Sequence, residues 1–180
     1  MQRYILTGAP GAGKTVLIRA LERAGHAVVE EAATDVIALA TARDVVEHWK
    51  EPSFIDDIVA LQRQRQLRAD RWPDELIFFD RSPICTLALC EFLGRDPTER
   101  LRAEIARIER EAIYQRRVLF VRNLGFVTPT EARRISLEDA LRFEEVHAQV
   151  YRRFGYELVE IPAVSLDERL AMIAATIDPT

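Results

Sequence analysis

Lysine and cysteine are scarce in this sequence, and long apolar segments are absent. Only Lys14 and Lys50 are lysines, whereas 23 residues are arginines. Acidic residues number 29 and basic residues 25, which gives a net charge of −4 at pH 7. A general nucleic-acid binder usually carries a basic excess, so no nucleic-acid partner is expected. No apolar run reaches the roughly 18 residues of a transmembrane helix, so no membrane span is expected either.

The two cysteines and three histidines give no sign of a cross-link or a metal site. Cys85 and Cys90 lie in a segment expected to be helical, where positions i and i+5 point in different directions. His26, His48 and His147 lack the spacing of metal ligands. Free thiols, together with an N-terminal apolar run too short for a signal peptide, predict a cytoplasmic protein.

The composition is that of a folded domain, since 48% of the 180 residues are hydrophobic and 30% are charged. This length predicts one domain, residues 1–180. Short apolar runs alternate with amphipathic helical patterns, which is typical of an α/β fold with a parallel sheet. The expected strands are Tyr4–Thr7, Ala27–Glu30, Leu76–Phe79, Val118–Val121 and Tyr156–Ile161. The expected helices are Lys14–Ala24, Ala32–Arg43, Ser53–Arg71, Pro83–Phe92, Pro97–Tyr114, Leu137–Phe154 and Leu166–Ile177.

One Gly-rich segment, Gly8–Thr15, fits the phosphate-loop pattern G-x-x-x-x-G-K-[ST] at every fixed position. An expected strand precedes it and an amphipathic helix follows, as this motif requires. A Gly-rich turn without a ligand is the alternative, but one of only two lysines occupies the position that requires lysine. We therefore predict a three-layer P-loop NTPase fold: a five-stranded parallel sheet, helices on both faces and a short helical lid. The nucleotide-binding residues would be Gly8, Ala9, Pro10, Gly11, Ala12, Gly13, Lys14 and Thr15.

The chemistry of such a loop assigns roles to individual residues. Its glycines allow backbone N–H groups to surround a phosphate, and the following helix N-terminus adds partial positive charge. Lys14 would contact the β- and γ-phosphates, and the Thr15 hydroxyl would hold Mg²⁺. Asp80, at the end of an apolar strand, would be the second metal-binding residue, usually through water. The alternative role for Asp80 is to cap the helix that begins at Pro83.

Two absences narrow the class of phosphate-loop protein. Arg81 follows Asp80 at the position where many motor ATPases carry a glutamate that polarises water. An Asn-Lys-x-Asp motif, which reads guanine in switch GTPases, is also absent. An aspartate followed by arginine is instead similar to small-molecule kinases, in which that arginine binds near the phosphoryl acceptor. A structural ion pair is the alternative role for Arg81.

Two adjacent glutamates, Glu30 and Glu31, follow the second expected strand. Ligands of open α/β sheets bind beyond the carboxyl ends of the strands, so one of the two should face the cleft. A carboxylate there could accept the proton of an attacking hydroxyl or fix its direction. Asp35 is the next candidate. The alternative is that these acidic residues only stabilise the N-terminus of a helix.

Eight segments spread over nearly the whole chain match one family. They are Gly8–Thr15, Glu31–Ala33, Phe79–Arg81, Glu131–Arg134, Phe143–Glu144, Val150–Tyr151, Phe154–Pro162 and Val164–Arg169. On these segments the sequence resembles the small phosphate-loop ATPases often labelled AAA-type, which are related to the ribosylnicotinamide kinase domain of the bacterial NAD-biosynthesis regulator. The resemblance implies a kinase-like fold, ATP binding, a small-molecule acceptor, and Glu31 as the inward carboxylate. Residues 122–127 lack the Trp-Pro-rich stretch of many members, so the acceptor pocket is not specified.

Two further segments supply candidate arginines and an acceptor wall. In related kinases a segment like residues 130–135 closes over the nucleotide, which would bring Arg133 and Arg134 to the transferring phosphate, with Arg142 behind them. On the expected helix Ser53–Arg71, Gln62 and Arg65 could contact the acceptor. In both segments the alternative is an arginine-rich surface that packs beside the helix and faces solvent.

Two functions remain open at this stage. The first is a Mg²⁺-dependent, ATP-dependent phosphotransferase acting on a small nucleoside-like or other hydroxyl compound. Its catalytic residues would be Lys14, Glu31, Asp80, Arg81, Arg133 and Arg134. The second is a nucleotide-binding regulatory ATPase module with slow or no turnover.

Overall fold

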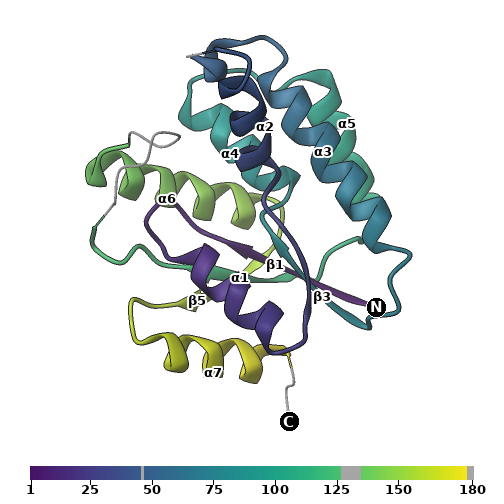
Figure 1. Cartoon of the computed structure of the whole chain (residues 1–180), viewed down its shortest axis with the longest axis vertical. Helices are drawn as coiled ribbons and strands as arrows, with labels where there is room; N and C mark the ends of the chain where they lie inside the picture. The colour runs from purple at the N-terminus through teal and green to yellow at the C-terminus, as the bar shows by residue number, and fades with distance from the viewer. Residues whose placement is uncertain (46, 127–134, 178–180) are drawn as a thin grey trace.

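The computed structural model describes residues 1–45, 47–126 and 135–177. Five parallel strands form one sheet in the order β2-β3-β1-β4-β5 (Figure 1). The α/β fold and the five-stranded parallel sheet are therefore confirmed. The strands are β1 Gln2–Thr7, β2 Ala27–Val29, β3 Leu76–Asp80, β4 Arg117–Val121 and β5 Glu157–Ile161.

Helices cover both faces of this sheet, with α1 and α7 on one side and α2 to α6 on the other (Figure 1). The alternation of side chains along the strands divides the core accordingly. Ile5 and Phe79 pack with the α2–α6 side, whereas Leu6 and Phe78 pack with the α1–α7 side. The helices are α1 Lys14–Arg23, α2 Ala32–Thr41, α3 Phe54–Ala69, α4 Pro83–Phe92, α5 Glu99–Arg110, α6 Leu137–Arg153 and α7 Leu166–Ile177; the short 3₁₀-helix η1, His48–Lys50, was not expected.

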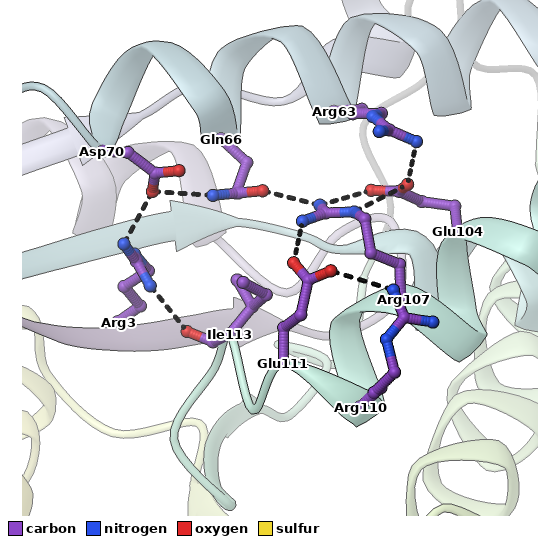
Figure 2. A network of polar contacts seen from close by, with 9 residues as sticks. All are labelled: Arg3, Arg63, Gln66, Asp70, Glu104, Arg107, Arg110, Glu111 and Ile113. Carbon is purple, nitrogen blue, oxygen red and sulfur yellow. Dashed lines mark hydrogen bonds and ion pairs between the residues drawn. The ribbon is translucent and has the colours of Figure 1, made fainter.

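A network of polar side chains ties α3 and α5 to the N-terminal end of β1 (Figure 2). At its centre the buried Arg107 donates to both oxygens of Glu104 (2.7 and 3.1 Å) and to Gln66 Oε1 (2.6 Å). Gln66 donates to Asp70, which also accepts a hydrogen bond from Arg3. Because the phosphate loop follows the other end of β1, this network stabilises the part of the fold opposite the loop.

Two expectations about the chain concern thiols and membranes. Cys85 and Cys90 are buried free thiols in α4, as predicted. Within the described ranges, no helix combines the length and the apolar character needed to cross a bilayer.

Candidate active site

The predicted phosphate loop connects β1 to α1 at the carboxyl end of the sheet. Gly8 is required there, because a Cβ atom on it would lie 2.2 Å from the carbonyl oxygen of Val121 at the end of β4. Gly11 and Gly13 have φ angles of 81° and 78°, the left-handed region in which other residues are strained. The three glycines therefore allow the loop to turn sharply between two packed strands and a helix.

Lys14 and Thr15 form the first turn of α1. The Lys14 side chain is 5% exposed, and its Nζ donates to the carbonyl oxygen of Ala9 across the loop (2.9 Å). Thr15 is exposed on the same turn. The ammonium group is thus held at the loop itself and not in either apolar core.

Asp80 ends β3 beside the start of the phosphate loop, since it is paired in parallel register with Leu6 of β1. The capping role considered for Asp80 is wrong. Ser82 is the N-cap of α4, and its Oγ accepts a hydrogen bond from the backbone N–H of Ile84 (3.2 Å). Asp80 is therefore placed where a second metal-binding residue was expected, and the helix has its own cap.

Arg81 joins three elements. Its φ angle of 75° is rare for a residue with a side chain, and its backbone N–H donates to the Leu6 carbonyl (3.0 Å). Its Nε lies 2.5 Å from Glu31 Oε1, after β2, and its Nη1 lies 3.2 Å from His147 Nε2 on α6. Burial lowers the pKa of Arg81, but the surrounding negative groups, Glu31 first and then Cys85 and Asp80, together raise it above its ordinary value, so the guanidinium stays charged. The ion pair considered as an alternative role for Arg81 thus exists, and the partner of Arg81 in it is Glu31, which is itself a predicted site residue.

His147 holds the guanidinium of Arg81 from the side opposite Glu31. Its Nδ1 lies 2.8 Å from the Phe143 carbonyl, to which it donates, so Nε2 is the acceptor for Arg81. Complete burial, together with the charge of Arg81, lowers the pKa of His147 to about 3. His147 is therefore neutral at physiological pH and can accept from Arg81.

This arrangement predicts a pH-dependent loss of stability. A histidine titrates at 6.5 in the unfolded chain but near 3 here, so the unfolded state binds more protons in between. Stability therefore falls as pH is lowered from about 6.5 towards 3, by up to about 1.4 kcal/mol per pH unit. His147→Gln keeps an acceptor but does not titrate, so it should lack this component. Urea unfolding of both proteins between about pH 6.5 and 4.5 measures the difference, and parallel curves would contradict the prediction.

The structure separates the three candidate carboxylates after β2. Glu31 is largely buried, with Oε1 at Arg81 and Oε2 accepting from the Thr34 hydroxyl (2.7 Å). Glu30 is exposed and paired with Arg19 (2.9 Å), and Asp35 is exposed and paired with Arg65. Glu31 therefore has the inward position.

A cavity of about 860 Å³ opens beside Glu31 and Arg81, between α2, η1, α3, α4 and α6. It reaches the phosphate loop at Pro10, which is one of its lining residues. Most of its wall surface is apolar, and charged side chains such as Glu31, Arg81 and Asp44 also line it. This volume and lining are typical of sites for small organic ligands. The aromatic lining residues are His48, Trp49, Phe54, Phe92 and Phe143, and the polar ones include Gln62, Thr86, Asp139 and Arg142.

The remaining candidates divide between the cavity and other places. Gln62 lies on the wall, where its Oε1 accepts from the Thr86 hydroxyl (3.1 Å), but Arg65 donates to the Glu30 carbonyl and is not among the lining residues. Arg142 lies over the Phe92 ring, 4.7 Å from its centroid, on the outer wall. The predicted lid arginines, Arg133 and Arg134, lie outside the described residues.

Two buried residues of α6, Glu144 and His147, support the site, although the sequence pointed to no role for either. Glu144 is buried on α6 and accepts from the backbone N–H of Asn123 (2.6 Å), while also pairing with Arg122 (3.2 Å). His147, one turn further along α6, holds Arg81. Glu144 and His147 are polar residues three positions apart on the buried, core-facing side of α6. Polar residues at apolar positions of a helical pattern are the signal that could have identified them.

Comparisons with solved structures agree with this architecture. Deoxyadenosine kinase from M. mycoides, with the products dCMP and dCDP bound, gives a TM-score of 0.64 at 12% identity, over 99% of this chain and 100% of the kinase chain. The NadR protein in complex with NAD and AMP-PNP gives a TM-score of 0.69 at 19% identity. That match covers 98% of this chain but 49% of the NadR chain. These similarities confirm the predicted P-loop kinase-like fold.

The sequence itself also has a family match. None of the curated proteins compared with it matches significantly. A family model described as an AAA domain, however, matches residues 3–169, from β1 to the first turn of α7. This span contains the phosphate loop, Glu31 and the Asp80-Arg81 pair, which are among the segments on which the AAA-type resemblance was recognised. Because the match covers most of the sequence, the chain belongs to the AAA-domain family.

Proposed function

We propose that this protein transfers the γ-phosphoryl group of ATP to a hydroxyl of a small organic molecule with an apolar or aromatic portion, such as a nucleoside. One observation carries the proposal: the Glu31–Arg81 pair lies on the wall of an apolar cavity that also touches the phosphate loop at Pro10. A nucleotide on the loop and an acceptor in the cavity would therefore meet beside a carboxylate. The kinase neighbours support this reading, since deoxyadenosine kinase and NadR are solved with nucleotides bound.

In the proposed reaction the acceptor oxygen forms a bond to the γ-phosphorus, and the bond from that phosphorus to the β–γ bridging oxygen breaks, releasing ADP. The acceptor proton passes to the carboxylate of Glu31. Each carboxylate oxygen has two lone pairs, so Glu31 can accept this proton while it pairs with Arg81 and Thr34. Arg81 keeps the carboxylate oriented and adds positive charge where negative charge develops. Arg133 and Arg134 remain proposed partners of the γ-phosphate.

The proposed cation is Mg²⁺. Thr15 offers a hydroxyl and Asp80 a carboxylate, and Mg²⁺ takes a few such oxygen ligands together with waters and phosphate oxygens. Across the described part of the chain, no cluster of three or more His, Cys, Asp or Glu could hold a metal by itself. The donor set thus fits an ion held jointly with a nucleotide, which neutralises charge on the β- and γ-phosphates when bound.

Replacing Asp80 tests this assignment. Asp80→Asn should weaken Mg²⁺ dependence and turnover strongly while leaving nucleotide affinity without Mg²⁺ nearly unchanged, because the amide is a poor ligand for the ion. Since Ser82 caps α4, the variant should keep the N-cap of this helix. Titrations of turnover with Mg²⁺ and of nucleotide with and without the ion measure this. A normal Mg²⁺ requirement in the variant would remove Asp80 from the metal site.

The function is tested by the fate of the γ-phosphate. Purified protein is incubated with γ-labelled ATP, Mg²⁺ and a panel of nucleosides and other hydroxyl compounds, and labelled products are separated. A new labelled ester supports the phosphotransferase. Free phosphate alone, released at the same rate with every acceptor, would instead support the regulatory ATPase module.

A further inference from the structure

The phosphate loop is held from outside by donors that come from distant segments. Asn123 Nδ2 donates to the carbonyl of Pro10 (2.9 Å), and Arg169 Nη1 donates to that of Ala12 (3.0 Å). Asn123 follows β4, and Arg169 lies in the first turn of α7. We call Asn123 and Arg169 the carbonyl brace, since each binds a loop carbonyl oxygen.

The brace fixes the direction of the loop's N–H groups. A trans peptide is planar, so its C=O and the N–H of the next residue point in opposite directions. A carbonyl of Ala12 that faces Arg169 therefore turns the N–H of Gly13 away from Arg169, and the Pro10 carbonyl does the same for the N–H of Gly11. Backbone N–H groups turned inward in this way are the donors with which a phosphate loop binds an anion.

Arg169 is an unusual group for this position. It is 4% exposed, and besides Ala12 it donates to the carbonyls of Pro162 (2.7 Å) and Arg122 (3.1 Å). No Asp or Glu in the described ranges lies within 4.0 Å of it, and burial lowers its pKa. A buried cation held by carbonyl dipoles alone gains from any anion that binds nearby. The packing is close, because a Cβ on Gly13 would lie 3.1 Å from Arg169 Nη1.

We infer that Arg169 is a positioning residue for nucleotide binding: with Asn123 it keeps the phosphate loop in the shape that binds di- and triphosphates, and its charge lies directly behind the loop. This inference rests on the nucleotide binding contained in the proposed function, but it requires no phosphoryl transfer. The inferred role gives α7, which follows β5 in the sequence, a part in the nucleotide site through its contact with the phosphate loop.

The test compares two arginines that both secure α7. Arg169→Met keeps length and apolar packing but removes the donors. Arg117→Met removes the hydrogen bond from β4 to the Thr176 carbonyl near the other end of α7 (3.0 Å), without touching the loop. Calorimetric titration with ADP and with ATP is done well below each melting temperature. Arg169→Met should weaken both nucleotides roughly tenfold or more, the usual scale for a lost charge-assisted hydrogen bond, whereas Arg117→Met should change them by less than about twofold.

Two further variants complete the design. Arg169→Lys keeps the charge but cannot reach three carbonyls, so it should recover part of the lost affinity. Asn123→Ala removes the other half of the brace and should also weaken ADP, which keeps the test valid if Arg169→Met does not fold. Wild-type affinity in Arg169→Met, or an equal loss in Arg117→Met, would overturn the inference. Wild-type protein that binds ADP but phosphorylates no acceptor would count against the transfer reaction and leave this test intact.

Discussion

Lys14→Ala is expected to lower turnover by about 10²-fold or more, because it removes a positive charge aimed at the transferring phosphate. The fold should survive, since Lys14 is bonded to the Ala9 carbonyl of the loop and packs in neither apolar core. Calorimetry with ATP and Mg²⁺ measures nucleotide affinity, which should also fall, a turnover assay measures the rate, and a thermal melt measures stability.

The chain supplies a matched control for this substitution. Lys50 is the other lysine of the sequence, is exposed, and pairs with Glu47 (2.6 Å). Lys50→Ala removes the same charge from the whole protein but should leave affinity and turnover unchanged. If Lys14→Ala were well folded and bound ATP as the wild type does, the nucleotide site would have to lie elsewhere.

Glu31→Gln is expected to preserve ATP affinity and to slow phosphoryl transfer by roughly 10²-fold or more, the usual range for a lost acid–base group. Glutamine keeps one oxygen that can accept from Arg81, and its amide NH₂ can donate to the Thr34 hydroxyl, but it cannot take the acceptor proton. The Arg81 guanidinium would lose its counter-ion, so the melting temperature should fall as well. Rates are measured at saturating ATP with an acceptor found by the screen.

Glu30→Gln is the control, because Glu30 is the exposed neighbour paired with Arg19. It loses the same charge from the same segment and should transfer phosphate at the wild-type rate. Equal rates in Glu31→Gln and the wild type would move the catalytic role to another carboxylate. A slow hydrolysis that neither substitution affects would favour the regulatory module.

Much of the fold and of the candidate site could be predicted from the sequence, because the strands and the phosphate loop depend on local sequence patterns. Buried parallel strands are continuous apolar runs, so all five were located within two residues of their observed ends. The loop motif has fixed spacing, and strand topology alone brings Asp80 next to it. The choice of Glu31 over Glu30 came from the resemblance, and the structure places Glu31 on the cavity wall and Glu30 outside it.

The residues that support the phosphate loop and Arg81 could not be predicted from the sequence, and the reason is physical. Arg169 and Asn123 bind backbone carbonyls, which every residue possesses, so no complementary side chain marks the partner position in the sequence. His147 lacks the spacing of a metal ligand, and its partner Arg81 lies 66 residues away in the sequence, so no local pattern marks the pair. Contacts of this kind are defined by how α6 and α7 pack, and packing is a property of the whole chain.

The central position of β1 in the sheet has a consequence for synthesis. β1 precedes both of its neighbours, β3 and β4, in the chain, so translation must continue through Val121 before β1 can be paired on both sides. Only then can Gly8 meet the Val121 carbonyl. Non-local parallel pairing is slow, and unpaired apolar strands are prone to aggregation. The nascent chain therefore carries an unpaired β1 until β3 is made, and a β1 that is paired on one edge only until β4 is made. This is the stage at which it would depend most on chaperones.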